Sequence, residues 1–229
     1  MSFKFNFQIE DENTEEIKQN IVDEFSVNEN NDIREDEAKL VEYQLKELNI
    51  SPRMMEVVDF HQNEILFKLI KPIDKFNNET EQMINIQKTD LIPGVYEGGF
   101  KLWECSIDII NYLIDNNTNL TGKNVLEIGC GHGLPGIYCQ KKGSNVTFQD
   151  YNDEVLLNLT FGNFKINCND HRQSLDRCRF ISGDWKHVDK LLGKEKYDLI
   201  LTSDTLYNIN SFLKLHNLIV NHLAVNGIW

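Results

Sequence analysis

Strand-like and helix-like stretches alternate along the second half of the chain. Apolar runs of strand length recur at 124–129, 145–150, 178–182 and 197–203. Segments with helical spacing of apolar residues follow them, at about 134–142, 153–167, 186–192 and 210–223. The run at 197–203 is apolar at nearly every position, as in a strand covered on both faces. This alternation predicts an α/β fold with a doubly wound, mostly parallel sheet.

The main domain is expected over residues 89–229. It opens with a glycine-containing loop, which leads into a helix expected over 103–115. The apolar residues on the inner face of this helix are Ile107, Ile110, Leu113 and Ile114. At the other end, Asn226 and Gly227 predict a turn, and Ile228 and Trp229 resemble the start of a further strand. The domain is therefore expected to be incomplete at its C-terminus.

Residues 38–88 are expected to form a small accessory element. Apolar residues at helical spacing predict an amphipathic helix over 36–48. Two strand-like pieces follow at 65–70 and 83–86, with a turn at Asn77–Asn78 between them.

Residues 1–37 are acidic, rich in Asn and poor in aliphatic residues, which predicts a disordered tail. Phe3, Phe5 and Phe7 alternate at its start and would share one face of an extended segment. Such a segment is either a sticky terminus or a short motif that adds to the sheet edge of a partner.

Charge and composition exclude several classes of function. The chain of 229 residues has 36 acidic and 23 basic side chains, a net charge of −13, which disfavours direct nucleic-acid binding. Its five cysteines include no C-x-x-C pair, which suits a reducing compartment, and the six histidines show no metal-ligand spacing. No apolar run is long enough to span a membrane, and no signal peptide is evident. We expect a protein of the cytoplasm and nucleus.

A glycine-rich loop directly follows the strand at 124–129. Glu127 lies near the end of that strand, and Gly129, Gly131 and Gly133 come next. Glycines allow tight turns and close approach of a ligand to the backbone. A carboxylate at this position would disfavour a phosphate group, so the loop favours a ligand with a cationic end, such as S-adenosylmethionine.

Polar residues also follow the other strands, where a doubly wound sheet binds its ligand. Asp150, followed by Tyr151 and Asn152, suits the ribose hydroxyls of adenosine, although a helix N-cap is the alternative role. The next group suits adenine, with Asp184 accepting from the exocyclic amine and Trp185 as an apolar wall, unless Trp185 is only a core residue. The members of this group are Gly183, Asp184 and Trp185. The last group, from Ser203 through Asp204 to Tyr207, would face the transferred group.

A dinucleotide-binding enzyme is a competing interpretation. Residues 131–136 fit G-x-G-x-x-G, and Asp150 lies where such enzymes place their ribose-binding acid. Glu127, the additional Gly129 and the Gly-Asp-Trp group at 183–185 favour methyl transfer instead.

Five motifs, in order, resemble the eukaryotic protein-histidine methyltransferases of the methyltransferase-like superfamily. They are DLIPGVYEGGFKLWEC at 90–105, VLEIGCGHGLPGI at 125–137, FQDYN at 148–152, CRFISGDW at 178–185 and YDLILTSDTLYN at 197–208. The resemblance implies a Rossmann-like fold and the cofactor S-adenosylmethionine. It also implies a histidine acceptor in a large-subunit ribosomal protein. Trp103 and Glu104 would border the methionine end of the cofactor, and Ser203 would line the crevice. At Asp184 the resemblance also leads us to expect Glu.

A histidine acceptor needs no strong base, because imidazole is mostly neutral at pH 7. We expect Asp204 or the hydroxyl of Tyr207 to hold the ring nitrogen that does not react. Two alternatives stay open: a lysine methyltransferase of the related family, which would need a base, and a cofactor-binding protein that chaperones a basic partner without catalysis. The expected partner is a protein, with no nucleic acid or membrane, and the chain is expected to be a monomer.

Overall fold

The computed structural model describes residues 39–40, 55–59, 66–70, 97–168 and 174–229. The chain divides into a unit at Met1–Arg34 and a unit at Glu35–Trp229, and all described residues belong to the second. The predictions for the tail at 1–37, for the turn at Asn77–Asn78 and for the strand at 83–86 therefore lie outside the described residues.

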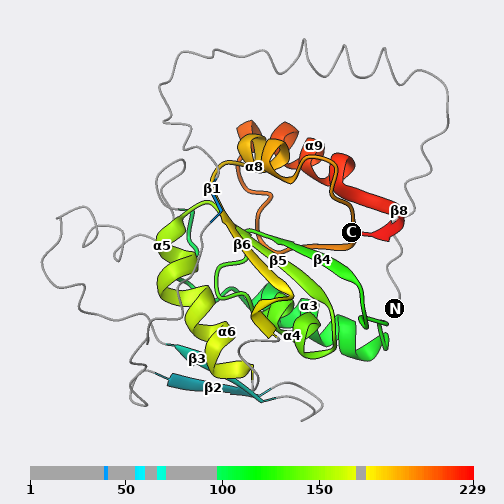
Figure 1. Ribbon diagram of the computed structural model, residues 1–229. Coiled ribbons are helices and arrows are strands. Elements are labelled where there is room, and N and C mark those ends of the chain that lie inside the picture. Colours follow the sequence, from blue (N-terminus) through cyan, green and yellow to red (C-terminus); the bar gives the residue numbers. More distant parts are fainter. Residues whose placement is uncertain (1–38, 41–54, 60–65, 71–96, 169–173) are drawn as a thin grey trace, which may run out of the picture. The chain divides into compact units, whose positions relative to one another are not determined.

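A six-stranded sheet forms the centre of the second unit, in the order β1-β6-β5-β4-β7-β8 (Figure 1). Its strands are β1 Lys39–Leu40, β4 Asn124–Ile128, β5 Asn145–Asp150, β6 Cys178–Ser182, β7 Tyr197–Thr202 and β8 Leu223–Ile228. β4 to β8 run parallel, and β1 pairs antiparallel with β6. The chain leaves β4 toward β5 on one side and later returns to β7 on the other, so a topological switch point lies beside β4. The predicted doubly wound sheet is confirmed.

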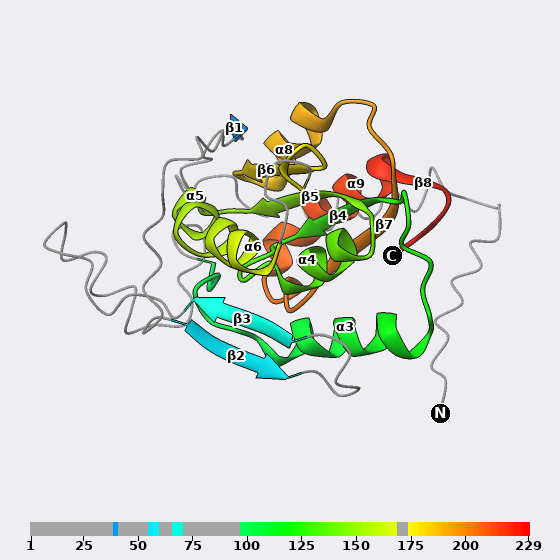
Figure 2. The ribbon, with the colours of Figure 1, turned by 60° about the horizontal axis from the view of Figure 1, so that its bottom comes forward.

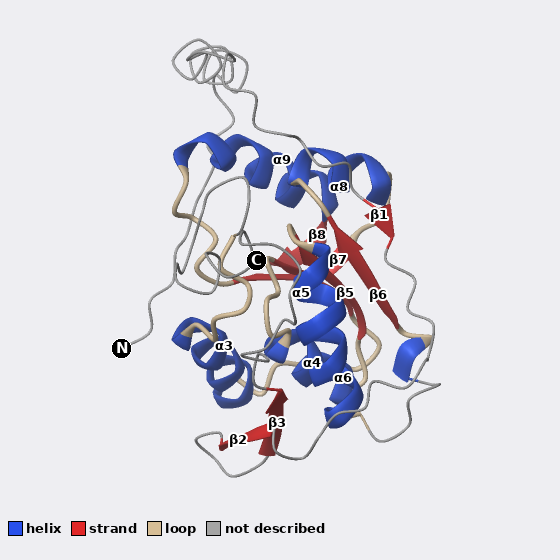
Figure 3. Cartoon of the chain, turned by 90° about the vertical axis from the view of Figure 1, so that its left-hand side faces the viewer, coloured by secondary structure: helices blue, strands red, loops and turns tan. Residues whose placement is uncertain are grey.

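Helices cover both faces of this sheet. On one face lie α3 Glu104–Asp115, α4 Leu134–Lys141, α5 Asp153–Val155, η2 Leu156–Thr160 and α6 Phe161–Asn167. On the other lie α8 Trp185–Leu192 and α9 Phe212–His222, the latter preceded by η3 Ile209–Ser211 (Figure 3). Each face has its own core: Val125 packs toward α3 and α4, and its neighbour Leu126 packs toward α8 and α9. This alternation is the two-residue period of a strand.

Aromatic rings fill the first of these cores. Phe148 on β5 stacks on Phe180 of β6 with centroids 5.0 Å apart. Phe161 and Phe164 of α6 meet the Phe180 ring edge-on at 5.7 and 5.8 Å. Edge-to-face aromatic contacts contribute roughly 0.5–1.5 kcal/mol each beyond burial. They fix α6 against the sheet.

The helix predicted over 153–167 contains a π-helical segment. η2 interrupts it at Leu156–Thr160, between the α-helical pieces at Asp153–Val155 and Phe161–Asn167. A π segment inserts an extra residue into a turn and is frequent at functional sites. Here it brings Thr160 against the glycine loop, where its hydroxyl donates to Gly131 O at 2.6 Å. Apolar periodicity carries no signal for such a segment.

The accessory region differs from the prediction. Lys39 and Leu40 form a strand on the edge of the main sheet, so the helix predicted over 36–48 is wrong at these two residues. The strand predicted at 65–70 is confirmed as β3 Leu66–Ile70, and it pairs antiparallel with β2 Met55–Asp59 (Figure 2). Asn167 joins β3 to α6, because its side chain accepts from Lys68 N at 3.0 Å and donates to Lys68 O at 2.8 Å.

The C-terminal residues also differ from the prediction. Asn226 and Gly227 lie within β8 rather than in a turn between elements, and β8 pairs parallel with β7 through an irregular register. Asn226 keeps the positive φ of a turn residue, 66°. The backbone of Asn226 thus has a turn-like conformation inside a strand whose register is irregular.

All five cysteines are described and are free thiols. Within the described ranges, no helix is long and apolar enough to cross a membrane.

Gly136→Ala tests how tightly α4 is held against the sheet. A Cβ at Gly136 would lie 2.5 Å from Phe148 Cε1 and would also overlap Glu127 Oε2. Overpacking of a core costs about 1–3 kcal/mol and occasionally more, and this Cβ would clash with two buried neighbours at once, so urea unfolding should show a loss of about 3 kcal/mol or more. As the control, Gly122→Ala has φ +70° but no atom within 4 Å, and should cost only the backbone strain of about 1–2 kcal/mol. Equal losses in both variants would contradict this prediction.

Candidate active site

The residues predicted to bind a ligand gather at the carboxyl ends of the parallel strands. The loops after β4, β5, β6 and β7 meet at this edge, next to the segment at 97–103 that precedes α3. Backbone and side-chain hydrogen bonds join these loops to one another. The predicted site residues are therefore brought together at one edge of the sheet, where a doubly wound fold binds its ligand.

Glu127 is buried behind the glycine loop. It is 3% exposed, lies on the same face of β4 as Val125, and its Oε2 accepts from Gly136 N at 2.9 Å. Gly136 is the third residue after the N-cap Gly133, so the carboxylate satisfies one of the unpaired N–H groups at the start of α4. Direct contact with a cofactor stays a prediction. The structure adds a capping role that the sequence did not predict.

Asp150 ties the end of β5 to the glycine loop. Its Oδ2 accepts from Gly131 N at 2.9 Å, and its Oδ1 accepts from Asn152 N at 3.2 Å. The N-cap of α5 is Asn152, so the alternative role of Asp150 as that cap is wrong. Burial raises the pKa of Asp150 to about 6, and the nearby Glu97 adds to this effect. Its predicted role toward ribose hydroxyls is untested.

Burial also raises the pKa of Glu127, to about 8, with a smaller contribution from the charge of Asp150. Two buried carboxylates thus lie close to one ligand-binding loop. At pH 7 a pKa of about 8 leaves Glu127 largely protonated, so a cationic ligand group nearby would favour its ionised form and a pyrophosphate would disfavour it.

His132, in the glycine loop, hydrogen-bonds to the segment at 97–103. A carbonyl oxygen only accepts, so its contact with Phe100 O at 3.2 Å makes Nε2 the protonated nitrogen. Nδ1 then accepts from the side chain of Asn163 at 3.4 Å. Burial lowers the pKa of His132 to about 4, so the ring is neutral at pH 7. Gly131 also needs the absence of a side chain, because a Cβ there would lie 3.1 Å from Gly99 O.

Gln149 is a residue that the sequence reasoning missed. Its side-chain carbonyl accepts from Gly129 N at 3.2 Å and from Trp185 Nε1 at 3.0 Å, and its amide donates to Gly183 O at 3.0 Å. The residue is fully buried. One side chain thereby holds the glycine loop, the loop after β6 and the predicted adenine wall Trp185 in register. The only signal was a polar residue inside an apolar strand.

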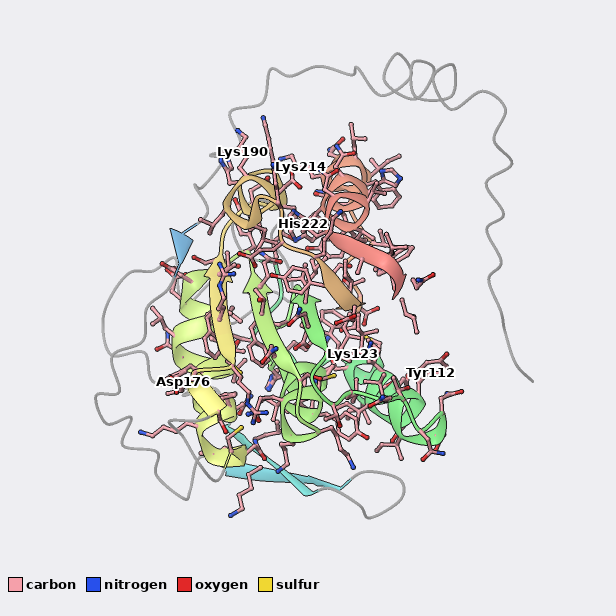
Figure 4. All side chains as sticks on the ribbon, turned by 45° about the vertical axis from the view of Figure 1, so that its right-hand side comes forward. Tyr112, Lys123, Asp176, Lys190, Lys214 and His222 are labelled. Atoms are coloured by element: carbon pink, nitrogen blue, oxygen red, sulfur yellow. The ribbon has the colours of Figure 1, made fainter. Side chains whose placement is uncertain are left out.

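Asp184 has structural partners for both carboxylate oxygens. Oδ1 accepts from Lys186 N at 2.9 Å as the N-cap of α8, and Oδ2 pairs with Lys214 Nζ of α9 at 2.9 Å. Figure 4 shows Lys214 on α9 above the sheet. The predicted contact of Asp184 with an adenine amine is untested. Asp184 also stabilises the start of α8 as its N-cap.

The loop after β7 contacts the start of α3. Asp204 has a positive φ of 52°, and its Oδ2 accepts from the thiol of Cys105 at 2.7 Å. Ser203 Oγ lies 3.3 Å from Ser106 Oγ. These contacts place Asp204, half of the predicted catalytic pair, directly beside the N-terminus of α3.

Tyr207 and Glu97 form the second contact between the segments at this edge. The Tyr207 hydroxyl donates to Glu97 Oε2, and Glu97 N donates to Asn152 Oδ1 at 3.2 Å. Burial and this carboxylate raise the pKa of Tyr207, so the phenol stays protonated. Glu97 was not among the predicted site residues, although it lies in the EGGFKLWE run that carries part of the resemblance.

The remaining predicted residues border the same edge. Trp103 is the N-cap of α3, its Nε1 donates to Gly98 O at 3.2 Å, and Lys101 Nζ lies 4.5 Å from the ring centre. Glu104 is exposed in the first turn of α3, and Tyr151 is half-buried after β5.

A sequence profile described as lysine methyltransferase matches residues 78–227. The histidine protein methyltransferase 1 homolog of Dictyostelium discoideum is 48% identical over 261 residues, which covers 99% of this chain and 82% of that protein. The chain belongs to the histidine protein methyltransferase 1 family. The resemblance seen in the motifs is confirmed, and so is S-adenosylmethionine as the cofactor of this methyltransferase.

Other members of the family are longer than the part this chain matches. The Bos taurus homolog is 41% identical over 164 residues, covering 61% of this chain and 44% of that protein.

Among solved structures, a putative SAM-dependent methyltransferase from Streptococcus mutans has a TM-score of 0.49 at 17% identity, covering 78% of this chain and 41% of that chain.

Glu127→Gln tests the cost of the buried carboxylate in this family member. A folded-state pKa raised from 4.5 to about 8 means that the contribution of Glu127 to stability is present below pH 4.5 and is lost as the pH rises toward 8. Each pKa unit corresponds to about 1.4 kcal/mol, so the loss is on the order of a few kcal/mol. The amide carbonyl can still accept from Gly136 N. Urea unfolding without cofactor should therefore show the variant more stable than wild type at pH 8 and similar at pH 5. A variant less stable than wild type at pH 8 would contradict the raised pKa of Glu127.

Gln149→Leu tests the three hydrogen bonds of the Gln149 side chain, which we call the Gln149 hub. They join β5 to the glycine loop, to the loop after β6 and to Trp185. The variant leaves two N–H donors and one carbonyl without their partner, at about 1–3 kcal/mol each if they stay buried. We expect S-adenosylhomocysteine affinity, measured by calorimetry, to fall by at least roughly tenfold. Gln140→Leu is the matched control: Gln140 is also a buried Gln, but on α4, where its side chain accepts from Cys168 Sγ. That variant should lose some stability and keep its affinity. Equal affinities in the two variants would overturn the hub assignment.

Proposed function

We propose that this chain transfers the methyl group of S-adenosylmethionine to a ring nitrogen of a histidine in a large-subunit ribosomal protein. The observation that carries this proposal is the 48% identity with a histidine protein methyltransferase 1 homolog over 99% of the chain. The net charge of −13 suits a basic protein partner. The proposal includes action as a monomer in the cytoplasm and nucleus.

The chemistry requires alignment more than activation. The lone pair of the neutral imidazole nitrogen forms the new N–CH₃ bond, and the C–S bond breaks with its electron pair moving to sulfur. A neutral imidazole is available, because the reference pKa of histidine is about 6.5. Holding the two reactants in line supplies several kcal/mol of the barrier reduction.

Tyr207 and Asp204 suit the task of orienting the acceptor. The Tyr207 hydroxyl donates to Glu97, so its oxygen lone pairs are left to accept from the N–H of the imidazole nitrogen that does not react. The product imidazolium must then lose that proton, and the Tyr207–Glu97 pair offers a path for it. Asp204, exposed beside Cys105, is a second acceptor at the same edge.

A lysine acceptor is the competing function. The matching profile is described as lysine methyltransferase, and a protein N-terminal and lysine N-methyltransferase of Cryptococcus neoformans is 36% identical over 117 residues. Lysine would first have to lose an ammonium proton, with a reference pKa of about 10.4. The same carboxylates would then serve as the base.

Methyl transfer to a purified large-subunit ribosomal-protein fraction tests the proposal. With methyl-labelled S-adenosylmethionine, acid hydrolysis and amino-acid analysis should show methylhistidine. Methyl-lysine alone would favour the competing function, and no label in either residue would overturn both.

Tyr207→Phe combined with Asp204→Asn tests the orienting role. We expect kcat to fall roughly 10- to 100-fold, as when a positioned proton acceptor is lost, with unchanged affinity for S-adenosylhomocysteine. Tyr112→Phe is the control and should keep full turnover, since the Tyr112 side chain on α3 is 64% exposed. Figure 4 labels this residue. Full turnover in the double variant would show that neither group orients the acceptor.

A further inference from the structure

Exposed apolar residues lie on both sides of the predicted catalytic residue Tyr207 in the chain and continue into the start of α9. We define the α9 patch as Leu206, Ile209, Phe212 and Leu213, whose exposed fractions are 57, 59, 42 and 46%. η3 leads directly into α9, so positions 209, 212 and 213 have the i, i+3 and i+4 spacing that gathers side chains on one face.

This face is not the one that packs on the sheet. The buried residues of α9 are Leu215, Leu218, Ile219 and His222, and they belong to the side turned toward the sheet and α8. An amphipathic helix that packs on one side normally has a polar outer side. Grouped exposed apolar residues on such a surface mark interaction sites.

We propose that the α9 patch docks the protein substrate, binding apolar side chains next to the methylated histidine. This inference rests on the proposed function and adds where the substrate binds. The patch adjoins the site in the chain, because Leu206 and Ile209 flank Tyr207, whose hydroxyl donates to Glu97. A protein substrate that reaches this edge has to lie against one of the loops that border it.

The surrounding charges define the chemistry of the partner. Asp204, two residues before Leu206, and Glu104 are exposed at this edge. Lys214, which directly follows the patch in the chain, is paired with Asp184 at 2.9 Å. The matching substrate segment is therefore basic, with apolar side chains among its cationic ones.

The length of the patch limits where those apolar side chains lie. Ile209 lies in the 3₁₀ turn and Leu213 in the first turn of α9, so with a rise of about 1.5–2.0 Å per residue the distance between them is roughly 6–8 Å. An extended substrate segment spans this distance with about two residues. The substrate thus has apolar residues close together in its sequence, near the histidine.

The double variant Ile209→Ser with Phe212→Ser tests the patch, using the large-subunit ribosomal-protein fraction as the probe. We expect KM for the protein fraction to rise at least tenfold, with kcat at saturation and S-adenosylhomocysteine affinity unchanged. The single variant Ile209→Ser should raise KM about threefold. Because Ile209 is 59% exposed, this variant is expected to fold and keeps the test informative if the double variant misfolds. Val220→Ser is the matched control, since Val220 is 58% exposed on the same helix but about two turns beyond the patch. It should leave KM unchanged.

Hydrogen exchange provides a measurement that needs no turnover. With S-adenosylhomocysteine bound, the protein fraction should protect the amides of 206–213 in wild type and not in the double variant. A wild type that makes no methylhistidine but shows this protection would overturn the proposed function alone. Unchanged KM together with absent protection, or an equal rise of KM in Val220→Ser, would overturn the docking surface. A wild-type dimer that the double variant dissociates would assign the patch to a second copy instead.

Discussion

Two adjacent side chains at the end of β5 hold the candidate site together. Successive residues of a strand point to opposite faces, so Gln149 and Asp150 reach in opposite directions from one strand end. Gln149 binds Gly129, Gly183 and Trp185, and Asp150 binds Gly131 and Asn152. Five hydrogen bonds from one strand end thus set the positions of three loops. Because both side chains are at least 96% buried, these bonds lie where water competes little.

The same arrangement makes the ionisation of two buried carboxyl groups unfavourable. Asp150 and Glu127 both have raised pKa values because they are buried, and each backbone N–H that they accept from lowers the cost only in part. In the folded protein without ligand, ionising either group therefore costs more than in water, and Glu127 is largely protonated at pH 7. A cationic sulfonium relieves this cost and a pyrophosphate adds to it, which gives a physical reason for the choice of cofactor. Stability given up at a binding loop is a common feature of functional sites.

The acceptor edge is built differently from the cofactor edge. Its contacts join segments far apart in the chain, such as Glu97 with Tyr207 and Cys105 with Asp204, and they leave exposed side chains facing outward. A buried cofactor loop next to an open, partly apolar rim is what a small cofactor and a large substrate together require. In the proposed reaction the rigid part would orient the methyl group and the open part would admit a protein segment.

The sequence by itself determined the parallel sheet and the edge at which the site forms. Apolar runs at strand length, with polar residues directly after them, report burial and chain reversal, and both are local properties that periodicity records. The placement of Asp150, Trp185 and Tyr207 at one edge followed from topology. Only the tertiary structure decided which atoms meet: the cap that Glu127 provides for α4, the hub at Gln149, the partner Glu97 and the π segment that delivers Thr160. These depend on contacts between residues up to 110 positions apart and on side-chain direction within a packed interior, which no local pattern encodes.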